Sequence, residues 1–189
     1  SDLVGKLVNL ASRTAKFIGK SGGMLAESID EPQLWQRFID ASDAIAQLYE
    51  DREYSRAMRE IMALADAANE YIAAKEPWKM AKESGKEAEV LAVCSQGINM
   101  FKVLMTYLKP VLPSTAAAAE EFLDLTLDWS TPPTYLTNHK INKFKPLMQR
   151  VEMEKIQAKI NASKSCLLNT SDNTDHPTNE NPEGPRNIK

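Results

Sequence analysis

A proline followed by a tryptophan interrupts a helical pattern in the segment NEYIAAKEPWKMAK. Pro77 has no backbone N–H and disfavours helical geometry in the residue before it, so we expect the helix to end near Glu76. Trp78 would then lie at a corner, where its ring could stack on an unstacked base of an RNA loop. The alternative is that Trp78 only plugs the junction between two helices.

A row of polar side chains on the first helix could supply hydrogen bonds and charge beside such a base. The row advances by steps of three and four residues, which places its members on one helical face: Lys6, Asn9, Arg13, Lys16 and Lys20. Asn9 is a poor helix former, but its amide can donate and accept hydrogen bonds together at a base edge. A plain solvated helix face is the competing interpretation.

The distribution of charge narrows where an anionic ligand could bind. The chain has 189 residues and a net charge of -3, which argues against unspecific binding of nucleic acid. Residues 1–24 have a net charge of +3, whereas residues 25–70 have a net charge of -7. We therefore expect an anion at the first helix and the Trp78 corner. Residues 139–164, with a net charge of +5, are a candidate for a second phosphate contact.

Helical periodicity recurs along the chain and strand-like alternation is almost absent, so we predict an all-α bundle of about five to six helices. The predicted helices cover residues 2–20, 33–51, 53 or 54 to 76, 87–108, 114 to 123 or 125, and 147–162. Ser1 or Asp2 is expected to cap the first of them and Ser114 the fifth. Residues 127–144, between the fifth and sixth helices, are expected to be irregular.

The composition changes after Ala162, where Asn, Ser, Thr and Pro dominate and apolar residues almost disappear. Such a segment cannot bury enough apolar surface to offset the entropy lost on ordering. We therefore divide the chain into a helical domain at residues 1–161 and a disordered or extended polar linker or tail at residues 162–189.

The sequence shows no pattern for catalysis or for metal binding. It has no Gly-rich phosphate loop, and His139 and His176 are isolated, without the spacing of metal ligands. Cys94 and Cys166 are far apart, as is typical of a reduced, cytosolic protein. We recognise neither a signal peptide nor an apolar run long enough to span a bilayer. The start without Met suggests an excised domain, for which we predict no catalytic residue and no metal site.

Four motifs stand in this order along the chain: VNLASR, REIMALADAANEY, EPWKMAK and INMFKVLMTYLKPVLP. Together they resemble the C-terminal anticodon-binding helical domain of bacterial methionyl-tRNA synthetase, a class I aminoacyl-tRNA synthetase. HKINKFKPLMQRVE is similar to the segment that ends this domain, so that the resemblance covers residues 1–160. The Asn-x-Tyr and Pro-Trp elements are shared with related class I synthetases, whereas NLASR combined with PWKMAK narrows the match to the methionine enzyme.

The resemblance implies recognition of the CAU anticodon. In this family an Asn and an Arg on the first helix and a Trp after the proline bind the anticodon, and by motif these are Asn9, Arg13 and Trp78. We assign Trp78 to stacking on the cytosine, which is worth about 1–3 kcal/mol. The side chains assigned to phosphates of the RNA are Lys6, Lys16, Lys79 and Lys82.

The resemblance also implies an intact cytoplasmic enzyme that attaches methionine to tRNA(Met) with ATP and Mg²⁺. Its catalytic domain, with a structural zinc, is missing from this sequence and would be a partner in cis. This chain by itself would be non-catalytic, would hold no cofactor and would bind the anticodon stem-loop of the tRNA. The tail resembles the tether that in many members leads to a dimerising domain, so the intact enzyme could be a homodimer. No membrane partner is expected.

Two other functions remain open from the sequence. The chain could be the equivalent bundle of another class I synthetase, such as the cysteine, valine or isoleucine enzyme. It could also be a helical protein-interaction module without RNA function, which predicts that no tRNA binds even at low salt.

Overall fold

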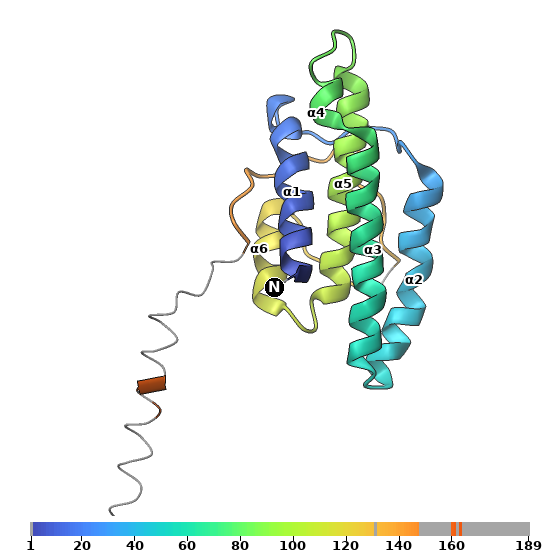
Figure 1. Ribbon diagram of the computed structural model, residues 1–189, viewed down its shortest axis with the longest axis vertical. Coiled ribbons are helices and arrows are strands. Elements are labelled where there is room, and N and C mark those ends of the chain that lie inside the picture. The colour runs from blue at the N-terminus through green and yellow to red at the C-terminus, as the bar shows by residue number, and fades with distance from the viewer. Residues whose placement is uncertain (1, 131, 148–159, 162, 164–189) are drawn as a thin grey trace, which may run out of the picture. The chain divides into compact units, whose positions relative to one another are not determined.

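The computed structural model describes residues 2–130, 132–147, 160, 161 and 163. The chain divides into two units, residues 1–148 and 149–189, and the helices named below belong to the first. In chain order they are α1 (Asp2–Lys20), α2 (Pro32–Glu50), α3 (Tyr54–Lys75), α4 (Pro77–Met80), α5 (Glu87–Leu108) and α6 (Pro113–Leu123) (Figure 1). Over the described residues the only β-type pairing is one isolated antiparallel bridge between Met24 and Lys140. The predicted all-α bundle is thus confirmed.

Proline decides where three of the helices begin. α2, α4 and α6 all carry Pro in the first turn, where a missing N–H costs nothing. The prediction that Ser114 caps α6 is wrong, because Pro113 begins the helix one residue earlier and Leu112 holds the N-cap position. Of the predicted caps of α1, Ser1 lies outside the described residues, and Asp2 is already helical. The helix predicted for residues 147–162 lies mostly outside them as well.

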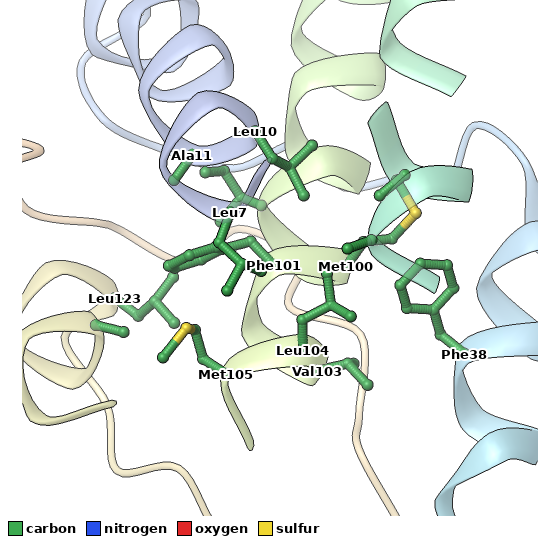
Figure 2. Packing of buried hydrophobic residues seen from close by; sticks show 14 of the residues in the cluster. Leu7, Leu10, Ala11, Phe38, Met100, Phe101, Val103, Leu104, Met105 and Leu123 are labelled. Atoms are coloured by element: carbon green, nitrogen blue, oxygen red, sulfur yellow. The ribbon is translucent and has the colours of Figure 1, made fainter. Parts of the chain in front are cut away.

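α5 is the central helix of the bundle, and α1, α2, α3 and α6 pack against it. Every residue from Val93 to Leu108 is buried. Figure 2 shows Leu7 from α1, Phe38 from α2 and Leu123 from α6 converging on α5. By length and composition α5 could cross a membrane, contrary to our expectation from the sequence, but 78% of its apolar window is buried inside the protein. Its apolar character therefore serves the core.

A glycine at the centre of α5 lets three helices approach closely. A Cβ atom on Gly97 would lie 2.7 Å from Cγ2 of Thr14 on α1 and 3.1 Å from Cδ1 of Ile72 on α3. A Cβ atom at 2.7 Å would force the Thr14 side chain to shift, so glycine at this position allows α1 and α5 to pack this closely. The approach fixes the position of α1, which carries the polar row found in the sequence.

Buried amides on α5 hold two extended segments against the bundle. Gln96 accepts a hydrogen bond from the N–H of Glu31 at 2.7 Å and donates one to its carbonyl at 2.9 Å. Asn99 pairs with Leu136 in the same way, with distances of 2.6 and 3.1 Å. These polar groups are buried in the core yet satisfied, as burial requires.

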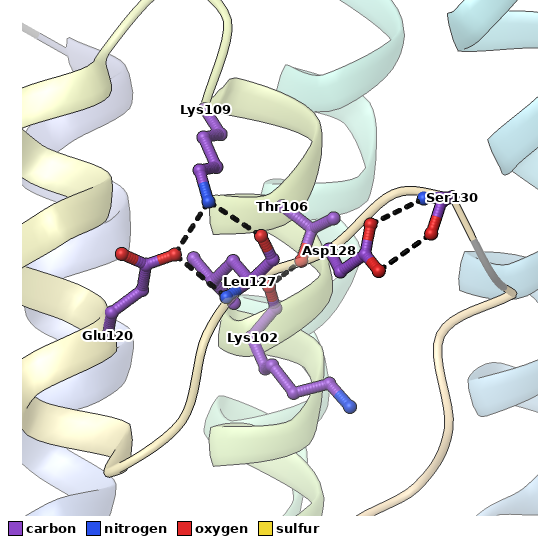
Figure 3. Close-up of polar contacts among 7 residues, drawn as sticks. All are labelled: Lys102, Thr106, Lys109, Glu120, Leu127, Asp128 and Ser130. Atoms are coloured by element: carbon purple, nitrogen blue, oxygen red, sulfur yellow. Dashed lines mark hydrogen bonds and ion pairs between the residues drawn. The ribbon is translucent and has the colours of Figure 1, made fainter.

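The end of α5 is tied to α6 and to the segment that follows it (Figure 3). Lys109 Nζ donates to Glu120 Oε1 and to the carbonyl of Leu127, both at 2.7 Å, and Glu120 also accepts from the N–H of Leu127 at 2.8 Å. The hydrogen bond from Lys109 lowers the pKa of the Glu120 carboxyl. Asp128 accepts two hydrogen bonds from Ser130 further along this segment. The irregular course predicted for residues 127–144 is therefore held by defined contacts.

A buried lysine on α5 makes the stability of the bundle depend on pH. Lys102 is only 7% exposed, its Nζ donates to the carbonyl of Thr134, and burial lowers its pKa from 10.5 to about 8. Between these values the unfolded chain binds a proton that the folded chain has released, so the free energy of unfolding rises with pH. From about pH 8 to about pH 10 we expect the wild type to gain on the order of 2 kcal/mol relative to Lys102→Met.

Urea unfolding of the two proteins at both pH values measures this difference. Every other titrating group is present in both proteins, so its contribution cancels when their free energies of unfolding are subtracted. Parallel pH dependences of the wild type and Lys102→Met would contradict the role given to Lys102.

Candidate functional site

The corner predicted at Pro77 begins with a residue in the left-handed conformation. Glu76, at φ 46° and ψ 54°, is at once the C-cap of α3 and the N-cap of α4. Its carbonyl accepts hydrogen bonds from the N–H groups of Lys79 and Met80 at 2.7 and 3.2 Å. The buried Pro77 then starts α4. The chain therefore turns at once after α3, as predicted, and α4 presents Trp78 beside α1.

A cavity of about 320 Å³ lies between Trp78 and α1, and we call it the tryptophan pocket. It is lined by Arg13, Lys16, Phe17 and Trp78. The indole is half-buried, packing partly against the core while it also lines the cavity. Each of the two interpretations drawn from the sequence is therefore correct for part of the ring. One part packs between helices, and the other is accessible from the cavity.

The tryptophan pocket combines positive charge with aromatic rings. Arg13 and Lys16 are exposed, and their side chains form no hydrogen bond or ion pair with other residues that the structure describes. The lining contains no carboxylate. A flat π-system can stack on the indole, while the guanidinium donates hydrogen bonds to a base edge or to a phosphate. This chemistry suits an unstacked nucleotide.

The structure brings together two of the three residues assigned to the anticodon. Arg13 and Trp78 share the tryptophan pocket, whereas Asn9 does not line it. Asn9 lies one turn earlier on α1 and is exposed. Lys16 and Phe17, on the turn after Arg13, complete the lining instead. Asn9 is therefore not part of the tryptophan pocket.

Two of the four lysines assigned to phosphates are already paired with carboxylates. Lys6 Nζ lies 2.5 Å from Asp66 Oδ1, and Lys79 Nζ lies 2.7 Å from Glu76 Oε1. Each carboxylate offsets the positive charge of the lysine with which it pairs. Lys82, by contrast, is exposed, and its side chain has no ion-pair partner in the described part of the chain.

Phe17 is a further residue of the pocket and was not among the site residues predicted from the sequence, because an apolar residue in an amphipathic helix is typical of the core. It is half-buried, lines the tryptophan pocket, and has the Lys20 ammonium 5.7 Å from its ring centroid. Its position four residues after Arg13 puts it on the same helical face, and that spacing was the available signal.

The Asn-x-Tyr element before the corner has a structural role. Asn69 donates to the carbonyl of Ala65 on its own helix at 2.8 Å and to that of Lys6 on α1 at 3.3 Å. The hydroxyl of Tyr71 donates to Asp30 at 2.9 Å. Both residues hold α3 against its neighbours and so fix the place of the corner.

Comparison with known proteins gives two findings. Residues 21–163 match the family model described as the anticodon binding domain of methionyl tRNA ligase. This match includes Trp78 but begins after α1. The fold is similar to crystal structures of Mycobacterium tuberculosis methionyl-tRNA synthetase: the apo form, with a TM-score of 0.70 at 16% identity over 80% of this chain, and the form bound by methionyl-adenylate, with a TM-score of 0.70 at 15% identity over 79% of it. The chain spans only about a third of their length, 33% and 32%.

Proposed function

Because this chain belongs to the family of anticodon-binding domains of methionyl-tRNA ligase, we propose that it recognises the CAU anticodon through the tryptophan pocket. Trp78 stacks on the cytosine, and Arg13 donates hydrogen bonds to a base edge or the adjacent backbone. Asn9 contacts a neighbouring base from the preceding turn of α1. Lys16 and the exposed Lys82 serve phosphates, whereas the paired lysines contribute less.

The observation that carries this proposal is the pairing of Arg13 with Trp78 across one solvent-accessible cavity. The two residues are far apart in the sequence, and they line one cavity because the corner at Pro77 brings α4 beside α1. Single-stranded RNA loops are read by this combination of an aromatic platform and hydrogen-bond donors. The acidic residues of α2 and α3 leave α1 and the corner as the surface that attracts an anion.

Titration of the chain with anticodon stem-loops that differ only in the three central bases tests the proposal. We expect the CAU loop to bind most tightly, and each changed base to weaken binding by about tenfold or more, as the loss of specific base contacts does. Tighter binding of a cysteine, valine or isoleucine anticodon would assign the chain to another class I enzyme. If no loop binds even at low salt, the remaining interpretation of the chain is a protein-interaction module.

The intact protein, in this proposal, is a methionine–tRNA ligase that attaches methionine to tRNA(Met) with ATP and Mg²⁺ in the cytoplasm. The catalytic domain acts in cis, and the enzyme is a homodimer where a dimerising domain follows. A structural zinc is assigned, in the same proposal, to the catalytic part. In this proposal the present chain contributes only tRNA binding to the intact enzyme.

A further inference from the structure

A second cavity lies beside the tryptophan pocket, with Lys16 as a wall common to both. Its volume is about 630 Å³, within the range of about 300–1,000 Å³ that pockets for small ligands occupy. We call it the glycine pocket. Its lining includes Lys16, Gly19, Gly23, Ile141, Lys143 and Phe144. It thus joins the C-terminal end of α1 to a segment more than a hundred residues later.

The far wall of the glycine pocket is held in place by backbone hydrogen bonds. The N–H of Ile141 donates to the carbonyl of Gly23 at 2.9 Å, and the N–H of Leu25 donates to that of His139 at 2.9 Å. Gly23 has a φ of 81°, and a Cβ atom there would lie 3.1 Å from the Ile141 carbonyl. Only glycine combines this conformation with this approach. The wall is therefore a fixed part of the fold.

The chemistry of the glycine pocket resembles that of its neighbour. Its lining has no carboxylate. Lys143 is exposed and forms no ion pair within the described residues, whereas Lys145, two residues later, pairs with Glu121 at 3.0 Å. The half-buried ring of Phe144 supplies an apolar surface on the same wall. Positive charge at the rim and an apolar interior suit a nucleotide, with its phosphate at the rim.

We propose that the glycine pocket binds a second nucleotide of the same RNA loop, adjacent to the one that Trp78 stacks on. Its base or ribose lies against Phe144, and Lys143 contacts its phosphate. Lys16, between the two cavities, contacts the phosphate that links the two nucleotides. Single-stranded RNA is held in this manner, by a positive track along its backbone with apolar surfaces for successive bases. This inference rests on the function proposed above.

Filling the cavity from α1 tests the proposal. Gly19 is exposed and lines the pocket, and a Cβ atom there meets nothing within 4 Å. Gly19→Leu therefore adds a side chain at the pocket wall, and leucine is also the better helix former. Ala44→Leu on α2, also exposed, is the matched control. We expect Gly19→Leu to weaken binding of the CAU stem-loop by about tenfold or more, as the loss of one nucleotide contact does, and Ala44→Leu to bind as wild type.

A pair of lysine variants gives a second measurement on the same wall. Lys143→Gln should lower the slope of log affinity against log salt by about 0.7, as expected for one lost contact to a single strand. Lys145→Gln should leave that slope unchanged, because its charge is already offset by Glu121.

The outcomes separate this inference from the function on which it rests. If Gly19→Leu binds the stem-loop as tightly as Ala44→Leu does, while Trp78→Ala binds it weakly, the second nucleotide site is wrong and the anticodon function stands. If the wild type binds no stem-loop, both fail. Equal salt slopes for the wild type and Lys143→Gln would remove Lys143 from the site.

Discussion

Replacing Trp78 with alanine is expected to weaken binding of the CAU stem-loop by about tenfold or more, because stacking on one base is worth about 1–3 kcal/mol. The indole forms one wall of the tryptophan pocket, and the remaining lining, with Arg13 and Lys16, has no second ring as large. Trp78→Phe keeps a smaller π-surface and should recover much of the loss. Equilibrium titration at fixed salt measures both variants.

The half-buried position of Trp78 requires a control for stability. Part of the ring packs against the core, so Trp78→Ala also lowers the free energy of unfolding. Binding is therefore measured well below the unfolding transition of the variant. Loss of stacking should leave the salt slope unchanged, because no phosphate contact is removed. An affinity within about twofold of wild type in the folded variant would contradict the stacking role.

Replacing Arg13 with alanine is expected to weaken binding by about tenfold or more and also to reduce discrimination between anticodons, since a bidentate contact to a base edge is worth about 1–3 kcal/mol. The guanidinium has no internal partner in the described structure, so its hydrogen-bond donors are available to a ligand. Arg13→Lys separates the two contributions, because it keeps the charge and removes the planar fork. Titration with CAU and altered loops at several salt concentrations measures both.

A matched control for Arg13 lies on the acidic side of the bundle. Arg59 is exposed on α3, and Arg59→Ala should leave affinity within about twofold of wild type. If Arg13→Lys discriminates between loops as well as the wild type does, Arg13 supplies charge alone. If Arg13→Ala matches Arg59→Ala, Arg13 is not in the site.

The helices and the corner were predictable from the sequence because local rules decide them. The apolar period gave residues 87–108 as a helix, and α5 has these bounds. Pro77 forbids the continuation of α3 wherever the rest of the chain lies, so the position of the break followed from one residue. The polar row on α1 likewise follows from helical spacing, and Asn9, Arg13 and Lys16 are all exposed.

Contacts between distant parts of the chain were not predictable in this way. The partner of Lys6 is Asp66, on another helix, and nothing in the spacing of either residue indicates the pair. It was likewise not predictable that Phe17 and not Asn9 would line the tryptophan pocket. That depends on which turn of α1 the corner packs beside. Burial of amides such as Gln96 depends on loop backbone that no helical period describes.

The hydrogen bonds from the buried amides of Gln96 and Asn99 on α5 bear on which positions can be varied in engineering. The side-chain amides of Gln96 and Asn99 bind only the main-chain N–H and carbonyl groups of Glu31 and Leu136. These hydrogen bonds therefore do not depend on which side chain stands at either position. Glu31 is exposed, so position 31 should accept most residues except proline, which lacks the N–H that Gln96 binds. Leu136 also packs its side chain against the core, so position 136 should accept only apolar residues of similar size. Libraries for retargeting the domain can therefore diversify position 31 while the scaffold beneath it stays constant.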